Sequence, residues 1–233
     1  MNILVTGASK GIGRTIAEFL KPYGNIYVTG RNEENLKSCK AEAYCVCDLS
    51  LNSEYLCEFI EKHNVDVLVN NAGEYIYGSI ETMKHSDINR IFNTNLIAPS
   101  YIISRAVPYM KTKKWGRIIN IGSISGVMGE AYASLYSSSK AGLIGLTKAL
   151  ALELAEYNIT VNTINPGWGE TDLGINSIDE SNFSKEEIIE CIPQKRFVKP
   201  EEIAALVKYL ISEEAKGITG QSINLCAGLS VGI

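Results

Sequence analysis

A tyrosine and a lysine four positions apart, Tyr136 and Lys140, form the pair in this chain best suited to proton transfer. Residues at that spacing on a helix lie on one face, a turn apart. A free tyrosine has a pKa near ~10, and an adjacent ammonium group favours the phenolate and lowers that pKa. The pair therefore predicts general acid–base chemistry at neutral pH. Taken alone, however, the same pair is common on helices and carries no function.

A glycine-rich segment near the amino terminus could bind a phosphate group. Residues 6–13, TGASKGIG, follow an apolar run and precede a helical pattern. Glycines let the backbone turn tightly and approach a pyrophosphate, and a helix amino terminus offers free N–H groups and a favourable dipole. The spacing is G-x-x-x-G-x-G rather than G-x-G-x-x-G. The strand–turn–helix context therefore supports a dinucleotide site more strongly than the glycines alone.

These residues need a scaffold, and the chain alternates short apolar runs with longer helical patterns. Strand-like runs lie near 2–6, 25–29, 43–47, 65–70, 116–122, 159–164 and 221–225. Helical stretches lie near 12–21, 33–39, 52–63, 84–112, 135–157 and 200–212. This alternation predicts βαβ units and a parallel sheet. We expect an α/β protein, with residues 1–233 forming a single domain: a doubly wound, Rossmann-like parallel sheet with helices on both faces.

The segment 167–199 interrupts this alternation. It contains three glycines, Pro193 and a short charged helix over 185–190. In α/β sheets, long insertions near the carboxyl ends of the strands often cover ligands. The apolar residues Trp168 and Leu173 favour a substrate lid over a plain surface loop.

Composition limits the classes of partner. The 233 residues are 45% apolar and 21% charged with a net charge of −4, and no basic block predicts a nucleic-acid partner. The six cysteines form no C-x-x-C pair, and we expect no metal site. No secretory leader is apparent and no apolar stretch is long enough for a bilayer, so we expect a cytoplasmic protein without a membrane partner.

Several motifs follow one another in an order that resembles the short-chain dehydrogenase/reductase family. They are Thr6-Gly-x-x-x-Gly-x-Gly13, Asn70-Asn71-Ala72-Gly73, Asn95, Ser123, Tyr136-x-x-x-Lys140 and Pro166-Gly167. Within the family, the chain is most similar to bacterial 3-oxoacyl-[acyl-carrier-protein] reductases, notably over 136–145 (YSSSKAGLIG) and 169–172 (GETD). The extended epimerase branch and the enoyl reductases space their motifs differently. The resemblance implies an oxidoreductase that interconverts a carbonyl and an alcohol with a nicotinamide cofactor.

The resemblance also implies a catalytic set, Asn95, Ser123, Tyr136 and Lys140. In the reductive direction, hydride is expected to pass from the cofactor to the carbonyl carbon while Tyr136 delivers a proton to the oxygen. Ser123 would hydrogen-bond that oxygen and fix its position. Lys140 would also hold the nicotinamide ribose, and Asn95 would complete a proton relay through water.

The identity of the cofactor is read from the end of the second predicted strand, Gly30-Arg31. NAD-preferring enzymes usually place an acidic residue here to bind the ribose hydroxyls. That acid is missing, whereas Arg31 suits a 2′-phosphate and Lys10 adds a second cation. We therefore expect NADP(H), with NAD(H) less favoured. Asp48 resembles the family aspartate at the adenine, although it could instead cap the helix near 52.

The expected cofactor-binding residues come from the glycine loop, the strand ends and the catalytic helix. They are Gly7, Ser9, Lys10, Gly11, Ile12, Gly13, Arg31, Asp48, Leu49, Asn71, Ala72, Gly73, Tyr136, Lys140, Pro166, Gly167 and Thr171.

The substrate is less clearly indicated. The expected wall comprises Ser123, Ser125, Val127, Trp168 and Leu173. Glu130 adds a charge that a purely apolar acyl pocket would not need. The resemblance implies a small carbonyl or alcohol substrate and favours one carried on acyl carrier protein. A free small ketone, a sugar-derived ketone and a hydroxysteroid remain alternatives.

An acidic carrier would require cations at the mouth of the pocket. Lys113 and Lys114 could serve, with Arg117 close by. The second basic position expected in carrier-protein reductases is occupied by Tyr157, which argues against the carrier.

A protein that senses NADP without turnover is the alternative from another class. A pure sensor, however, has no need of Ser123, Tyr136 and Lys140. Relatives usually form tetramers, so the resemblance implies a homotetramer or homodimer packed through the helices near 84–112 and 135–157. The apolar end of the chain, 229–233, fits such an interface.

Overall fold

A parallel sheet forms the centre of the molecule in a computed structural model that describes residues 1–51, 54–170 and 184–231. Its order is β3-β2-β1-β4-β5-β6-β7, and every recorded pairing between neighbours is parallel. The strands are β1 (Asn2–Val5), β2 (Asn25–Gly30), β3 (Ala43–Val46), β4 (Val67–Asn70), β5 (Gly116–Ile121), β6 (Ile159–Pro166) and β7 (Ser222–Leu225). The order runs outward from β1 to β3 and resumes at β4 on the other side of β1. This confirms the doubly wound sheet and places its topological switch point between β1 and β4.

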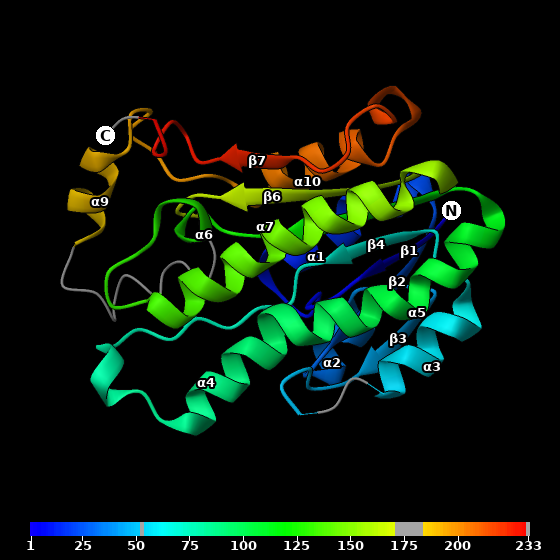
Figure 1. The fold of residues 1–233 in the computed structure, drawn as a ribbon, viewed down its shortest axis with the longest axis horizontal. Coiled ribbons are helices and arrows are strands. Elements are labelled where there is room, and N and C mark those ends of the chain that lie inside the picture. Colours follow the sequence, from blue (N-terminus) through cyan, green and yellow to red (C-terminus); the bar gives the residue numbers. More distant parts are fainter. Residues whose placement is uncertain (52–53, 171–183, 232–233) are drawn as a thin grey trace.

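Helices cover both faces of the sheet, as Figure 1 shows from the side of α5 and α7. One face packs against α1 (Gly11–Leu20), α2 (Glu33–Ser38) and α10 (Pro200–Leu210), and the other against α3 (Glu54–His63), α5 (Ala98–Lys113) and α7 (Ser134–Leu154). Successive residues of β1 alternate between the faces: Ile3 and Val5 join the first core, and Leu4 joins the second. Since both faces are buried, the central strands β1 and β4 are apolar except for one asparagine each.

The predicted helix over 84–112 is three elements rather than one. It comprises α4 (His85–Phe92), a π-helical turn η3 (Asn93–Ile97), and then α5 with Pro99 in its first turn. The predicted 135–157 helix ends at Leu154 and continues as a 3₁₀ turn, η4 (Ala155–Tyr157). Single π-helical turns often occur at functional positions within helices.

Short elements connect these layers. They are η1 (Lys21–Tyr23), η2 (Ile80–Thr82), α6 (Ser125–Met128), α9 (Lys185–Cys191) and η5 (Glu213–Ala215). The short charged helix predicted over 185–190 is α9, and Ser184 and Glu187 form a capping box at its start. Among the helices of the described residues, none has the length and apolar character to cross a membrane.

Candidate active site

A cavity of about 360 Å³ opens at the carboxyl ends of β1, β4, β5 and β6. In Figure 1 this is the edge toward which the arrows of β6 and β7 point. Most of the expected cofactor residues line it: Gly7, Ser9, Lys10, Gly11, Ile12, Arg31, Asp48, Leu49, Asn71, Ala72, Gly73, Tyr136, Lys140, Pro166 and Gly167. Thr171 and Leu173 lie outside the described residues. Motifs that are far apart in sequence therefore meet in one cavity.

The glycine loop needs its glycines for close packing. Gly7 has a φ of +66°, and a Cβ there would lie 2.7 Å from the Cα of Ala72. Gly13 does not line the cavity. A Cβ at Gly13 would lie 2.4 Å from Asn71 Nδ2, so this glycine allows helix α1 to start against the neighbouring loop.

Asn71 joins the loops after β1 and β4 across the switch point. Its Nδ2 donates to the carbonyl oxygens of Thr6 (2.9 Å) and Gly7 (3.2 Å). In return, Thr6 Oγ1 accepts from the backbone N–H groups of Asn71 and Ala72, each at 3.0 Å. These bonds hold together the two loops that supply Gly7, Asn71 and Ala72 to the lining of the cavity.

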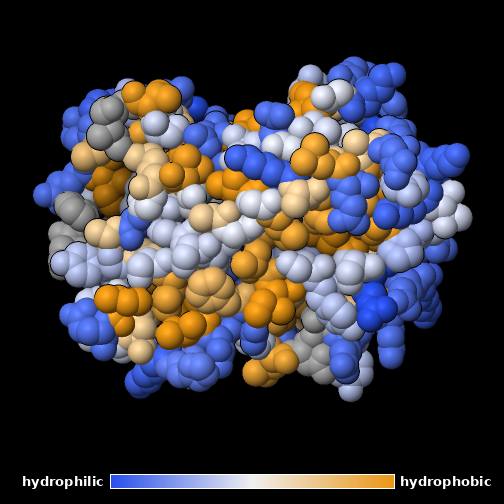
Figure 2. Space-filling view, viewed as in Figure 1, coloured by the Kyte–Doolittle hydropathy of each residue, from blue (hydrophilic) through white to orange (hydrophobic). Residues whose placement is uncertain are grey.

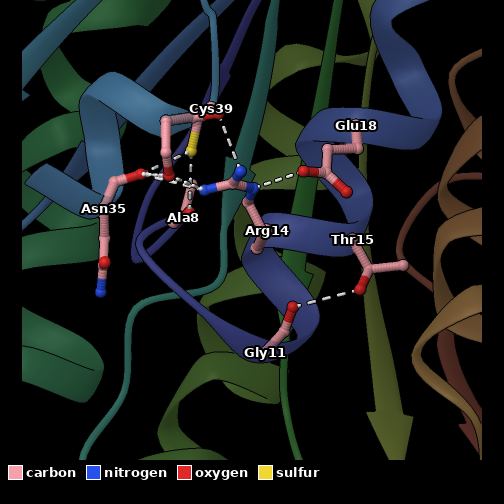
Figure 3. Close-up of polar contacts among 8 residues, drawn as sticks. Ala8, Gly11, Arg14, Thr15, Glu18, Asn35 and Cys39 are labelled. Carbon is pink, nitrogen blue, oxygen red and sulfur yellow. Dashed lines mark hydrogen bonds and ion pairs between the residues drawn. The ribbon is translucent and has the colours of Figure 1, made fainter.

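Arg14 fastens the glycine-loop helix α1 to the end of α2 (Figure 3). Its guanidinium donates to the carbonyl oxygens of Asn35 and Ser38, each at 2.9 Å, and pairs with Glu18. The thiol of Cys39 donates to the carbonyl oxygen of Ala8 at 3.4 Å. The phosphate loop is therefore braced from the helix that follows Arg31.

Arg31 lines the cavity and pairs with Glu74, an acid that belongs to no recognised motif of the sequence. Its Nη1 lies 2.9 Å from Glu74 Oε1, and Arg90 Nε lies 3.1 Å from Glu74 Oε2. Glu74 immediately follows the Asn-Asn-Ala-Gly run. Only this position next to a motif could have marked it in the sequence as a residue of the site. Two arginines thus meet at the end of the cavity where a 2′-phosphate was expected.

Asp48 forms a local turn and lines the cavity. Its Oδ1 accepts from Ser50 N at 2.9 Å and from Ser50 Oγ at 2.7 Å. Burial acts to raise the pKa of Asp48, but these hydrogen bonds and the charges of Arg31 and Arg90 outweigh it and lower the pKa below its usual value. The side chain therefore stabilises its own loop and remains ionised beside the cavity.

Ser123, Tyr136 and Lys140 meet at the other end of the cavity. Ser123 follows β5, and the other two lie one turn apart on α7. Lys140 Nζ donates to the carbonyl oxygen of Ile121 at 2.8 Å and lies 5.7 Å from the centre of the Tyr136 ring. A Cβ at Gly73 would lie 3.3 Å from that Nζ, so the glycine leaves space for the amine.

Burial governs the acidity of this pair. It raises the pKa of Tyr136 to about 12, against a lowering effect of a hydrogen bond with Ser123, and it lowers the pKa of Lys140 to about 8. The prediction that Lys140 lowers the pKa of Tyr136 is therefore wrong for the chain without cofactor. Desolvation penalises the charged form of each group and dominates, because the ammonium is directed to Ile121 rather than to the phenol.

Asn95 is buried in the π-helical turn and does not line the cavity. Its Oδ1 accepts from Glu74 N at 2.8 Å, and its Nδ2 donates to Glu74 O at 2.9 Å and to Ser139 Oγ at 3.0 Å. The side chain thus ties the loop after β4 to helix α7. Its expected role in a proton relay remains a prediction.

The substrate end of the cavity is lined partly by expected residues. Ser125 and Trp168 line it, and Trp168 stacks with Phe197 at 6.4 Å between ring centres. Val127 is 45% exposed and lies outside the lining of the cavity formed by the described residues. The next residue of α6, Met128, takes that place, since neighbouring helix positions point in different directions.

Four hydrogen-bonded polar side chains form a cluster at this end. Tyr75 Oη donates to Glu130 Oε1 and Ser125 Oγ donates to Glu130 Oε2, each at 2.6 Å. Ser123 Oγ lies 3.1 Å from Ser125 Oγ. Tyr75 also packs edge-on against Tyr136 at 5.0 Å. Nothing in the sequence indicated that Tyr75 faces Glu130, because the two come from loops after different strands.

The cations expected at the mouth lie elsewhere. Lys113 ends α5 and pairs with Asp66, which precedes β4, and Arg117 is the second residue of β5. Both therefore lie toward the amino ends of the strands, the edge opposite the cavity, and Lys114 follows Lys113 there. Arg117 is wholly buried, with Nη2 3.3 Å from Glu213 Oε1. The prediction that they border the mouth is wrong for this chain.

Comparison with protein families and curated proteins gives consistent matches. The family model for short chain dehydrogenase matches residues 1–182. A 3-oxoacyl-[acyl-carrier-protein] reductase from Rickettsia prowazekii is 39% identical over 97% of this chain and 95% of its own length. The corresponding reductase from Vibrio harveyi is 38% identical over 97% and 96%.

Two solved structures are similar over nearly the whole chain. A tryptophan variant of actinorhodin polyketide ketoreductase with NADPH has a TM-score of 0.91 and 34% identity, covering 99% of this chain and 97% of the other. YwfH, an NADPH-dependent reductase of bacilysin biosynthesis, has a TM-score of 0.92 and 32% identity, covering 100% and 99%.

Proposed function

Because the chain belongs to the short-chain dehydrogenase family, we propose that it is a reductase that uses NADPH to convert the ketone of a 3-oxoacyl thioester into a secondary alcohol. Family membership makes it an oxidoreductase that acts on CH–OH groups, with NADP(H) as its cofactor. The ketone substrate is the proposal. The observation that carries it is that Ser123, Tyr136 and Lys140 share one cavity with the glycine loop and Arg31.

The described residues fit a dinucleotide with a 2′-phosphate. Gly7 and Gly11 line the cavity at the start of α1, where free N–H groups favour a pyrophosphate. Arg31, with Arg90 near it, supplies guanidinium groups at the far end, and guanidinium matches phosphate geometrically. When bound, NADPH would supply the hydride that reduces the carbonyl carbon.

Tyr136 would supply the proton that the carbonyl oxygen needs. With its pKa raised to about 12, the phenol is protonated at neutral pH and is therefore poised to act as an acid. Ser123 would hydrogen-bond the carbonyl oxygen and hold it near the phenol. Lys140, protonated below its pKa of about 8, would stabilise the phenolate left after transfer. The free protein is thus prepared for the reductive direction.

The substrate proposal rests on the names of the relatives and on the apolar side chains of Trp168 and Met128 in the wall. Delivery on an acyl carrier protein is part of the proposal. A free small ketone, a sugar-derived ketone and a hydroxysteroid are the alternatives that a substrate screen must include.

We further propose that residues 1–233 form one domain that assembles into dimers or tetramers. The sheet is continuous from β3 to β7, and apolar side chains are spread over the face with α5 and α7 (Figure 2). Leu152 on α7 is 86% exposed in the single chain. Light scattering of the purified protein measures the state, and a monomer would contradict the assembly.

The decisive experiment follows NADPH absorbance with acetoacetyl-coenzyme A and a panel of ketones. We expect turnover, and we expect Tyr136→Phe to lose at least about a hundredfold in kcat. The variant should still bind NADPH, because the substitution removes only the hydroxyl group of Tyr136 and keeps the ring. A wild-type protein that binds NADPH but reduces no ketone would contradict the proposal and favour a sensor.

A further inference from the structure

Glu130 places a carboxylate in the wall of the substrate end of the cavity. It lies in the loop between α6 and α7, and its backbone N–H donates to Ser137 Oγ at 3.1 Å. Both carboxylate oxygens accept short hydrogen bonds from hydroxyl groups, those of Tyr75 and Ser125. The carboxylate is therefore held in one orientation by two separate segments, and its backbone is anchored to α7.

Among the residues that the structure describes, no cation lies within ion-pair distance of this carboxylate. Its partners are two neutral hydroxyl groups, which stabilise the anion but leave its net charge in the cavity. A partly enclosed cavity screens such a charge less than bulk water does.

The carboxylate is also close to the reacting centre. An ionised carboxylate can only accept hydrogen bonds, so Ser125 must donate to it. Ser125 Oγ is then free to accept from Ser123 Oγ at 3.1 Å, which puts Glu130 two hydrogen bonds from the serine that would hold the carbonyl. The negative charge of Glu130 also contributes to the raised pKa of Tyr136, after burial, so its field reaches the phenol.

We propose that Glu130 is a specificity-determining residue: its carboxylate makes the enzyme reject ketones that carry a negative charge near the reacting carbonyl. This inference rests on the proposed function of the site. The favoured substrates are ketones whose neighbouring acyl group is neutral, such as an ester or thioester, rather than free oxo acids.

Repulsion between like charges gives the expected size of the effect. Two carboxylates held several ångströms apart in a partly enclosed site disfavour binding by about tenfold to about a hundredfold. A thioester or ester of the same carbon skeleton does not carry this cost. The structure therefore predicts discrimination by charge between molecules of nearly the same shape.

The test compares acetoacetate with its ethyl ester in the wild-type protein and in Glu130→Gln. Glutamine keeps the shape, accepts from Tyr75 and can donate to Ser125, but it carries no charge. The wild-type protein should prefer the ester in kcat/KM, and the variant should reduce that preference at least about tenfold by improving acetoacetate. The control is Glu81→Gln, which removes an exposed charge on η2 and should leave the preference unchanged.

A second measurement needs no turnover. Affinities of the NADP-loaded protein for acetoacetate and for the ester are measured by calorimetry, and Glu130→Gln should strengthen only acetoacetate binding, by about tenfold. The role of Glu130 would be overturned if the wild type and Glu130→Gln showed the same ratio of kcat/KM, or of affinity, for the ethyl ester relative to acetoacetate. Absence of any ketone reduction would instead overturn the proposed function, and the binding comparison would still decide the role of Glu130.

Discussion

Burial moves the two ionisable groups of the catalytic helix in opposite directions, and each moves toward its neutral form. The pKa of Tyr136 rises to about 12 and that of Lys140 falls to about 8. Both side chains lie almost entirely inside the fold, at 9% and 3% exposure. At neutral pH the pair is therefore a phenol and an ammonium, which is the combination that can donate a proton and then stabilise the anion left behind.

The lowered pKa of Lys140 predicts a pH dependence of stability. Below about pH 8 the amine is protonated in the folded and unfolded states, so the cost of burying its charge is fully present. As the pH rises toward the ordinary value of 10.5, the folded protein loses this proton first and the cost disappears. Relative to Lys140→Met, the wild-type chain should therefore become more stable over this range, by up to about tenfold in the folding equilibrium constant per pH unit.

Urea unfolding of the two cofactor-free proteins, from about pH 7 to about pH 10, measures this difference. Lys148→Met provides the control, because Lys148 lies on the exposed side of the same helix. The difference in free energy of unfolding between the wild type and Lys148→Met should not change with pH. If the difference between the wild type and Lys140→Met also does not change with pH, the pKa of Lys140 is not lowered.

At the scale of elements, the site is assembled where α6 meets α7. Ser125 begins α6, while Tyr136 and Lys140 lie on α7. A Cβ at Gly126 would lie 2.8 Å from both the Cβ and the carbonyl carbon of Lys140. The two helices can approach this closely only because Gly126 has no side chain, and the spacing between Ser125 and Lys140 depends on it.

Two glycine-to-alanine substitutions test this contact. Gly126→Ala should push α6 away from α7, lowering kcat at least about tenfold and stability by about 1–3 kcal/mol. Gly145→Ala, in α7 with no atom within 4 Å of its added methyl group, should raise stability by about 0.5–1 kcal/mol and leave kcat unchanged. Urea unfolding and NADPH oxidation measure both effects. Full activity in Gly126→Ala would show that the close approach of α6 is not needed.

Features that depend on residues close together in the chain were predictable from the sequence. The strand runs at 2–6 and 116–122 correspond to β1 and β5 within a residue, because apolar runs bounded by turns mark buried parallel strands. The glycine loop and the Tyr136–Lys140 pair were found because their members are close in sequence. The π-helical turn at 93–97 was not found, since the surrounding pattern is helical throughout.

Features that depend on the packing of distant segments were not predictable. Glu74 reaches Arg31 from the loop after another strand, and Tyr75 reaches Glu130 in the same way. The pKa of Tyr136 was predicted in the wrong direction because burial, which sequence spacing does not report, outweighs the nearby ammonium. Distances across the sheet and solvent exposure arise only when the chain has folded.

At the scale of the whole molecule, the cavity is shared between the two halves of the sheet. The half containing β1 to β3 contributes the glycine loop, Arg31 and Asp48, and the half containing β4 to β7 contributes Tyr136 and Pro166. A ligand that touches both halves binds only the folded chain, because unfolding separates them. Cofactor binding should therefore stabilise the entire fold, by about 2.7 kcal/mol when the cofactor is present at about a hundred times its Kd.

Thermal unfolding with NADPH and with NADH tests the role of Arg31 in this linkage without any turnover. At equal concentrations NADPH should raise Tm more than NADH, by several degrees, because only NADPH carries a 2′-phosphate for the Arg31 guanidinium. In Arg31→Asp the advantage of NADPH should disappear or reverse, since an acidic residue at this strand end favours ribose hydroxyls and repels phosphate. Glu130→Gln serves as the control, because Glu130 lies at the substrate end. It should show the same difference in Tm between NADPH and NADH as the wild-type protein. Equal shifts with both cofactors in the wild-type chain would mean that Glu74 holds Arg31 too firmly for a 2′-phosphate to displace it, and that the cavity does not distinguish the two cofactors at this position.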